Sequence, residues 1–485
     1  EALLLHHDVL RSRFKREGDA VVQVNLPPES HQVIVEEYDF RQCALFDEKI
    51  TCLCDKLESR LDLSEGPIIR CGLFKTQKGD HLLIDVHHLI IDAVSWRILL
   101  EDLSTCYQMD QPSRQLTGQS KSASFAQWSD ALFEYLESPD LESQIPYWIS
   151  VSEEKDTSIG NCPETDDYVE DSGILSFCLG EQETENLIRH TNSAYNTTIN
   201  DILLSALSMA IYEAFAIQCK KIMLESHGRT GLSDKLNLDL SRTVGWFTCM
   251  YPVLLKTEPF GDIGEQIIRT KNMLAQIPLN GIGYGILRYL AKHRLFLKDK
   301  PEISFNYLGQ FDETFNQTDF QLSTLDPGSM TSKRNRRLFP ITLTGQIYNG
   351  ELTFYIDYNR RYYTEDTISR FLNCYRSALL KVIEHCRLQY QEKKYIQAMP
   401  QRVYELSVQQ KQMLYYYLLE PQNPLYLIQY KATLTGNINP NALEAAFGRL
   451  IQKYDVLRSA LTVDGEDYEK QVILPHVEPN FFYKD

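Results

Sequence analysis

The sequence lacks several features that define large classes of protein. It contains no run of about 18 apolar residues, as a membrane-spanning helix requires, and no recognisable signal peptide. Basic residues are in the minority, since 49 lysines and arginines stand against 66 aspartates and glutamates, which leaves a net charge of −17. Nucleic-acid-binding proteins usually have a basic face. We therefore expect neither a nucleic-acid partner nor a membrane partner.

The cysteines give no sign of a disulfide framework or a metal site. There are 11, an odd number, and they are scattered along the chain. Together with the missing signal peptide, this pattern predicts reduced thiols in a cytoplasmic protein. Cys52 and Cys54 form the only close pair, and neither a second pair nor histidines at ligand spacing accompany them. No metal site is predicted.

The composition is that of a globular protein with both helices and strands. The 485 residues, 43% hydrophobic and 24% charged, predict about three domains or two large ones. Residues 1–14 are predicted to be the end of an amphipathic helix. Apolar periodicity predicts further helices at 93–107, 125–136, 198–215 and 364–385, and strands near 21–24, 32–35, 70–74, 81–87, 174–179, 221–225, 250–255, 341–348 and 351–358. Asn349-Gly350 between the last two strands is a strong hairpin signal.

Two polar stretches and one internal repeat organise the chain. Residues 152–173 and 391–402 are predicted to be linkers. The pentapeptide Asp-Val-Leu-Arg-Ser occurs at 8–12 and again at 455–459, each time before a strand-like stretch. We infer that the chain holds one domain without its first strand and helix, followed by the beginning of a related domain.

The chemistry-bearing residues begin with a histidine pair at the end of a strand. His87 and His88 are followed four residues later by Asp92 at a strand-to-helix turn. Side chains alternate along a strand, so one ring can point into a cleft while the other packs inside. On residue types alone, a structural turn with one buried histidine remains the alternative.

Several segments together resemble the epimerization domains of nonribosomal peptide synthetases, which belong to the condensation-domain superfamily. Residues 87–96 resemble the signature His-His-x-x-x-Asp-x-x-Ser-Trp, in which Ser95 and Trp96 favour epimerization over condensation. Glu225, His227 and Arg229 lie in a segment similar to Glu-Gly-His-Gly-Arg. Further matches, in the family's order, are residues 239–248, 250–252, 281–285 and 305–310.

The resemblance implies a mixed α/β fold of two lobes, each similar to chloramphenicol acetyltransferase, that meet in a V with a tunnel between them. It implies an N-terminal lobe at 1–160, a C-terminal lobe at 161–390, a linker at 391–403 and a condensation-domain fragment at 404–485. Residues 406–410 match the usual opening of a condensation domain. Alternatively, this fragment supplies the strand and helix that are missing before Glu1.

The resemblance also implies the reaction, which is inversion of the α-carbon of an aminoacyl or peptidyl thioester. A carrier domain upstream would deliver the substrate on its phosphopantetheine arm, so no cofactor of the chain's own is expected. The product would be a D-configured unit for peptide antibiotic synthesis, passed to the condensation domain downstream. Removing the α-hydrogen needs a base, and inversion needs an acid on the opposite face.

We assign these proton-transfer roles to Glu225 and His88. A carboxylate at the end of an apolar strand is expected to be partly desolvated, which would raise its pKa. Asn306 and Tyr307 are candidates to hydrogen-bond the thioester or its enolate oxygen, or else they pack and cap their strand. The other site residues are given supporting roles: His87, Ser95, Trp96, an Asp92 paired with an arginine, and His227 and Arg229 as structural or cleft-lining residues.

Three positions depart from the family pattern. Glycine is usual at Ala93 and Ser226, and a second acid is usual at Thr230. These departures keep open a non-catalytic relative that docks or gates a carrier domain. A peptide-bond-forming condensation domain shares His88 but does not explain Glu225, Ser95-Trp96 or residues 305–310.

Overall fold

The computed structural model divides into two compact units, residues 1–383 and 384–485. The structure describes residues 1–18, 20–30, 33–43, 45–66, 68–109, 122–160, 167–258, 261–291, 301–310, 320–398, 402–419, 439–464, 467–477, 479 and 481. Parts of both predicted linkers, 161–166 and 399–401, lie outside these residues, as does Gln32. None of the described helices is long and apolar enough to cross a membrane.

The first part of the larger unit contains two small sheets and three main helices. Strands β1 (Ser12–Glu17) and β2 (Ala20–Asn25) form an antiparallel pair, and β3 (Val35–Asp39), β4 (Ile69–Thr76) and β5 (Gly79–Val86) form a mixed sheet. The helices are α1 (Ala2–His6), α2 (Asp47–Glu58) and α3 (Ala93–Gln108), and the short 3₁₀ turns are η1 (Asp8–Arg11), η2 (Pro28–Ser30) and η3 (His88–Ile90).

Two predictions in this region were wrong in their boundaries. The helix predicted for residues 1–14 ends at His6. The chain is already extended from Ser12, because Ser12 pairs with Asn25 in the β1–β2 ladder. The strand predicted at 32–35 begins only at Val35, where pairing with Cys71 starts.

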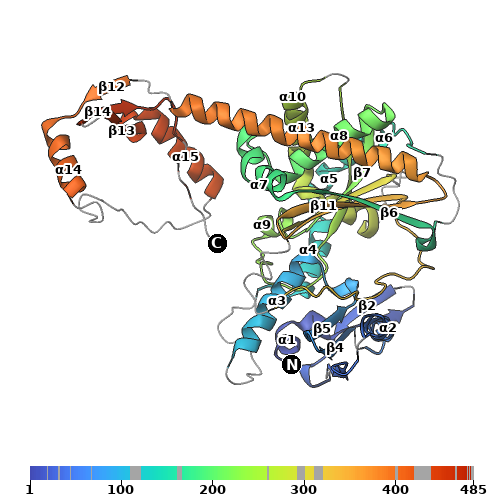
Figure 1. Ribbon diagram of the computed structural model, residues 1–485. Coiled ribbons are helices and arrows are strands. Elements are labelled where there is room, and N and C mark those ends of the chain that lie inside the picture. The colour runs from blue at the N-terminus through green and yellow to red at the C-terminus, as the bar shows by residue number, and fades with distance from the viewer. Residues whose placement is uncertain are drawn as a thin grey trace. The chain divides into compact units, whose positions relative to one another are not determined.

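A six-stranded sheet forms the framework of the second part (Figure 1). Its order is β6 (Ser172–Leu179), β11 (Glu351–Asn359), β10 (Ile341–Tyr348), β9 (Ile303–Gln310), β7 (Cys219–Ser226) and β8 (Cys249–Lys256). Helices α7 (Glu181–Tyr195), α8 (Ile199–Phe215), α10 (Ile263–Ala275) and α13 (Glu365–Ala398) accompany it. The ring of Tyr375 on α13 meets Phe354 of β11 at 5.0 Å between centroids, which anchors that helix on the sheet.

The described residues of the larger unit also form several shorter elements. They are α4 (Phe125–Leu136), α5 (Pro139–Ser143), α6 (Ile145–Glu153), η4 (Val169–Asp171), α9 (Leu232–Leu236), η5 (Pro278–Gly281), α11 (Ile282–Gly285) and a π-helical turn, η6 (Ile286–Leu290). Helix α4 has the bounds that the sequence predicts, because Ser124 and Gln127 form a capping box at its start.

Helix α13 is longer than predicted and runs through most of the expected second linker. It was expected to end near His385 but continues to Ala398. The added stretch is polar, and residues such as glutamine, glutamate and lysine are good helix formers. Pro400 is the first helix-breaking residue beyond it.

The smaller unit confirms the internal repeat in three dimensions. It contains β12 (Arg402–Glu405), α14 (Val408–Leu419), α15 (Pro440–Lys453), η7 (Asp455–Arg458), β13 (Ser459–Asp464) and β14 (Asp467–Ile473). Like Arg11 after α1, Arg458 follows the helix within a 3₁₀ turn that leads into a strand. Arg11 donates to the carbonyls of Leu4 and Leu26, and Arg458 donates to those of the equivalent Ile451 and Leu474.

Replacing Gly350 with alanine is expected to lower the free energy of unfolding by about 1–2 kcal/mol, because an L-residue is strained in the left-handed region. Asn349 and Gly350 join β10 to β11 with φ values of 50° and 75°, as the hairpin prediction requires. Gly285→Ala is the matched control, since Gly285 is helical and a Cβ there meets no atom within 4 Å. Urea unfolding of both variants measures the difference, and equal stabilities would contradict the expectation.

Candidate functional site

Glu225 lies at the end of the buried strand β7, where the strand leaves the apolar interior. Ile222 and Leu224 before it are buried, whereas Glu225 is half-buried. The parallel ladder with β9 pairs Leu224 with Phe305, so the following residues, Glu225 and Asn306, are neighbours. The Nδ2 of Asn306 donates to the Oε2 of Glu225 at 2.7 Å.

Burial raises the pKa of Glu225 above its ordinary value. The charge of His88 acts in the opposite direction and lowers the pKa of Glu225. Glu225 and His88 lie on two segments, 137 residues apart in the chain, that the ion pair of Arg229 with Asp92 joins.

The two histidines have different environments, but not through strand alternation, because β5 ends at Val86 and His88 begins the 3₁₀ turn η3. His88 is exposed, and its ring lies 5.7 Å from that of Trp246 between centroids. His87 is half-buried, and its Nδ1 accepts a hydrogen bond from the backbone N–H of Leu89 at 3.2 Å. Burial and the neighbouring His88 both lower the pKa of His87. The accessible ring of the pair is thus His88.

Asp92 begins α3 and forms the predicted pair with an arginine. Its Oδ1 accepts from the backbone N–H of Ser95 at 2.7 Å, which caps the helix. The Nη2 of Arg229 lies 2.9 Å from Oδ1 and 3.1 Å from Oδ2. Asp92 and Arg229 are both buried, so this is a desolvated ion pair.

Arg229 also connects the histidine segment to residues 240–247 of the larger unit. Its Nη1 donates to the carbonyls of Leu240 at 3.0 Å and Thr243 at 2.6 Å, and its guanidinium lies 4.0 Å from the ring centroid of Phe247. The Nη2 donates to the Oγ of Ser95, which donates to the carbonyl of Gly245. Arg229 and Ser95 therefore join the histidine segment to the loop after β7 and to residues 240–247.

Three further predicted site residues, Tyr307, Trp96 and His227, each have their own contacts. Tyr307 on β9 is partly buried, which raises its pKa to about 12 and keeps its hydroxyl protonated as a donor. Trp96 packs against the apolar cluster that includes Ile90 and Ile98. His227 is exposed, and its Nδ1 accepts from the backbone N–H of Arg229 at 3.1 Å. Its contacts are therefore those of a turn-forming residue.

Asn306→Ala should move the acidic limb of the pH–rate profile to higher pH. A hydrogen bond to the charged form stabilises a carboxylate, so losing the Nδ2 donor is expected to raise the pKa of Glu225 further. We expect kcat to fall about tenfold near neutral pH, where a larger fraction of the carboxyl is protonated. Rates of α-hydrogen exchange between pH 5 and 9 measure this change. An unmoved acidic limb would show that the contact does not tune Glu225.

A second link between distant segments was not predicted from the sequence. His7, directly after α1, contacts Asp102 of α3 at 2.8 Å between Nε2 and Oδ2, and Arg242 contacts the other oxygen of Asp102 at 2.5 Å. The signal was available in part, because Asp102 follows Ile98 and Leu99 on the buried face of its helix. A carboxylate in such a place requires a charged or hydrogen-bonding partner.

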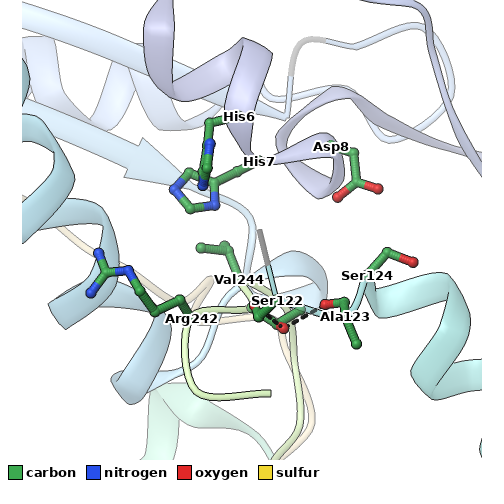
Figure 2. A pocket seen from close by; sticks show the side chains of 9 residues that line it. His6, His7, Asp8, Ser122, Ala123, Ser124, Arg242 and Val244 are labelled. Atoms are coloured by element: carbon green, nitrogen blue, oxygen red, sulfur yellow. Dashed lines mark hydrogen bonds between the residues drawn. The ribbon is translucent and has the colours of Figure 1, made fainter. Parts of the chain in front are cut away.

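This link borders a small cavity of about 20 Å³ (Figure 2). Ligand atoms of His6, His7 and Asp102 lie within 4.8 Å of one another, as a metal site would need. However, the guanidinium of Arg242 already neutralises the carboxylate, and its positive charge opposes a metal cation. We interpret the cluster as a structural cross-link.

The fold and these motifs define a condensation-type domain, and comparison with known proteins shows the family directly. The family model described as "Condensation domain" matches residues 1–399 and again 400–484. The chain therefore belongs to the condensation-domain family. The predicted mixed α/β fold is confirmed, and the second match agrees with the relation between the two parts of the chain that the sequence repeat indicates.

Two relatives are synthases that are much longer than this chain. The chain is 38% identical over 395 residues to tyrocidine synthase 2 of Brevibacillus parabrevis, covering 80% of this chain. It is 32% identical over 506 residues to bacitracin synthase 3 of Bacillus licheniformis, covering 100% of this chain. It spans only 11% and 8% of their lengths, respectively. A crystal structure of the epimerization domain from the third module of tyrocidine synthetase B is 36% identical, with a TM-score of 0.74 over 80% of this chain and 87% of that one.

Proposed function

We propose that residues 1–390 invert the α-carbon of an aminoacyl or peptidyl thioester, converting the L to the D form within a nonribosomal peptide synthetase. The substrate would be tethered to the phosphopantetheine arm of an upstream carrier domain. The likeness to a solved epimerization domain at 36% identity supports this choice within the family. The segment from residue 404 would be the beginning of the downstream condensation domain.

The observation that carries the proposal is the half-buried carboxylate of Glu225, on a segment that the Arg229–Asp92 ion pair joins to the segment of His88. A half-buried carboxylate with a raised pKa is a better base than an exposed one. The thioester carbonyl delocalises the negative charge that forms when the α-hydrogen leaves. Glu225 takes this proton from one face, and protonated His88 returns a proton to the other face, which inverts the centre. Each proton carrier is restored by exchange with water.

Two neighbouring groups are suited to assist the same step. Asn306 keeps the carboxylate of Glu225 in place through its 2.7 Å hydrogen bond. Tyr307, with its protonated hydroxyl, is a candidate donor to the enolate oxygen. Asp92 and Arg229 already neutralise each other, so their role is to fix the backbone that bears His88 and Glu225.

The test uses the full chain and a carrier domain loaded with an L-aminoacyl-phosphopantetheine in deuterium oxide. We expect deuterium at the α-carbon and a mixture of L and D product after hydrolysis, measured by mass spectrometry and on a chiral column. The loaded carrier alone serves as the control. If folded protein leaves only unlabelled L product, the proposal is wrong. A new amide bond with an added acceptor, without deuterium, would indicate a condensation domain instead.

A further inference from the structure

The turn that follows α10 has a backbone that only its surroundings can maintain. Leu279, Asn280 and Gly281 are consecutive residues in the left-handed region, with φ values of 44°, 53° and 88°. Two of them carry a Cβ, and each such residue is strained in this conformation. Strain of this kind persists where neighbouring contacts over-determine the chain, and it is frequent near functional sites. The contacts that hold this turn therefore merit a functional explanation.

Asn280 supplies those contacts through both its side chain and its backbone. Its Nδ2 donates to the Oγ1 of Thr230 at 3.0 Å. Its carbonyl accepts from the Oγ of Ser226 at 3.4 Å and from the Sγ of Cys249 at 3.7 Å. Ser226 and Cys249 are cross-strand partners in the β7–β8 ladder, and their Oγ and Sγ atoms are 2.9 Å apart. One residue thus ties the end of β7, the start of β8 and the loop after β7.

Two glycines allow the turn to approach this closely. A Cβ on Gly231 would lie 3.0 Å from the carbonyl oxygen of Leu279. A Cβ on Gly281 would lie 1.9 Å from the ring of Tyr251 on β8. The turn is therefore in close contact with both the loop and the strand, and small changes in its position would be transmitted to them.

We infer that Asn280 is a positioning residue, because its hydrogen bonds hold Ser226 and Thr230, the two ends of the segment 226–230. Ser226 directly follows Glu225, and Thr230 directly follows Arg229, which is paired with Asp92. Because Asn280 contacts both residues, it fixes the backbone between Glu225, the predicted proton carrier, and Arg229. The ion pair of Arg229 with Asp92 then joins this backbone to the histidine segment.

This inference explains two of the three departures from the family pattern. Glycine, which is usual at Ser226, has no hydroxyl to donate to the Asn280 carbonyl. At Thr230, where an acid is usual, the hydroxyl accepts from the Asn280 amide. The two replacements contact the same residue and form one hydrogen-bonded unit. Neither position is one of the two proposed proton carriers.

The kinetic test rests on the proposed function and removes one hydroxyl. Thr230→Val has nearly the same shape but lacks the acceptor, whereas Thr230→Ser keeps it. We expect kcat for α-hydrogen exchange to fall about three- to tenfold in Thr230→Val, as expected for the loss of one hydrogen bond, with KM unchanged. A looser segment admits water to Glu225, so the acidic limb of the pH–rate profile should move to lower pH. Thr230→Ser should behave like the wild type.

A second variant separates the hydrogen bond from the strain of the turn. Asn280→Gly keeps the left-handed backbone and its carbonyl but loses the amide, and it should reproduce the kinetics of Thr230→Val. The inference is wrong if Thr230→Val matches the wild type in kcat and pH profile. It is also wrong if Thr230→Ser loses as much activity as Thr230→Val, because then the hydroxyl is not what matters.

Alkylation of Cys249 tests the positioning role of Asn280 without an activity assay. Burial raises the pKa of this thiol to about 11, so it should react slowly with iodoacetamide. Peptide mass spectrometry is expected to show labelling about three- to tenfold faster in Thr230→Val and Asn280→Gly, with exposed Cys52 and buried Cys386 as references. A wild type without exchange activity would overturn the proposed function alone. An unchanged rate of Cys249 labelling would overturn the positioning role of Asn280.

Discussion

Glu225→Gln is expected to reduce kcat for α-hydrogen exchange by about 10²- to 10⁴-fold, the usual contribution of a positioned acid or base. Glutamine has the same shape, and its side-chain oxygen can still accept from the Nδ2 of Asn306. It cannot take a proton from carbon. The loss would therefore report the missing base rather than a change of packing. Single-turnover exchange with a saturating loaded carrier measures kcat directly.

The same variant should be at least as stable as the wild type at pH 8. Burial raises the pKa of Glu225, so the ionised carboxylate is less favourable in the folded than in the unfolded state at a pH above both pKa values. Replacing it with a neutral amide removes that penalty. Thermal unfolding at pH 8 should give an equal or higher Tm. A lower Tm together with the activity loss would indicate disrupted packing and would remove the support for a catalytic base.

Glu351→Gln is the matched control for this experiment. Glu351 begins β11, is exposed, and shares the sheet with Glu225. Its replacement should change neither exchange rate nor Tm. If Glu225→Gln retained exchange within a few fold of this control, the assignment of Glu225 as proton carrier would be wrong. If His88→Ala then lost exchange while Glu225→Gln did not, a residue other than Glu225 would be the base that acts with His88.

Local sequence signals predicted most regular elements because their causes are local. The β10–β11 hairpin follows from two turn residues, and α4 from a capping box. The first 14 residues were mispredicted because pairing of β1 with β2 decides their conformation. Whether a residue joins a strand depends on the partner it pairs with, and the apolar pattern of the first 14 residues does not contain that partner.

The site divides in the same way. Motif resemblance proposed His88 and Glu225, whereas the expectation that one histidine would be accessible holds for another reason, since His88 lies in a 3₁₀ turn after β5 and not in the strand. Asp92 was expected to meet an arginine, but the partner's identity and its additional contacts to Leu240 and Thr243 appear only in three dimensions. His7, Asp102 and Arg242 lie 95 and 140 residues apart, and no periodicity connects them.

Arg229→Ala is expected to lower the free energy of unfolding by about 3–5 kcal/mol, because it leaves the buried carboxylate of Asp92 without its counter-charge. Two backbone carbonyls, of Leu240 and Thr243, would lose a charged donor as well. Urea unfolding measures the effect. Arg242→Ala, which removes the partly exposed arginine from Asp102, should cost less because His7 still contacts that carboxylate.

A double-mutant cycle with Asp92→Ala separates the ion pair from other losses. When both partners are removed, no unpaired charge stays buried, so the double variant should be less destabilised than the sum of the single variants. Arg229→Lys provides a milder case that is expected to fold. One ammonium group cannot reproduce the planar set of donors to Asp92, Ser95 and two carbonyls, nor the stacking on Phe247. We therefore expect it to lose about 1–3 kcal/mol.

The activity of Arg229→Lys then connects stability to function. Under conditions in which the variant is fully folded, its exchange rate should still be reduced, because Arg229 fixes the segment that bears Glu225 relative to the helix that follows His88. Additive energies in the cycle would show that Asp92 and Arg229 do not act as a pair. Wild-type exchange in folded Arg229→Lys would show that the pair stabilises the domain without aligning the two proton carriers.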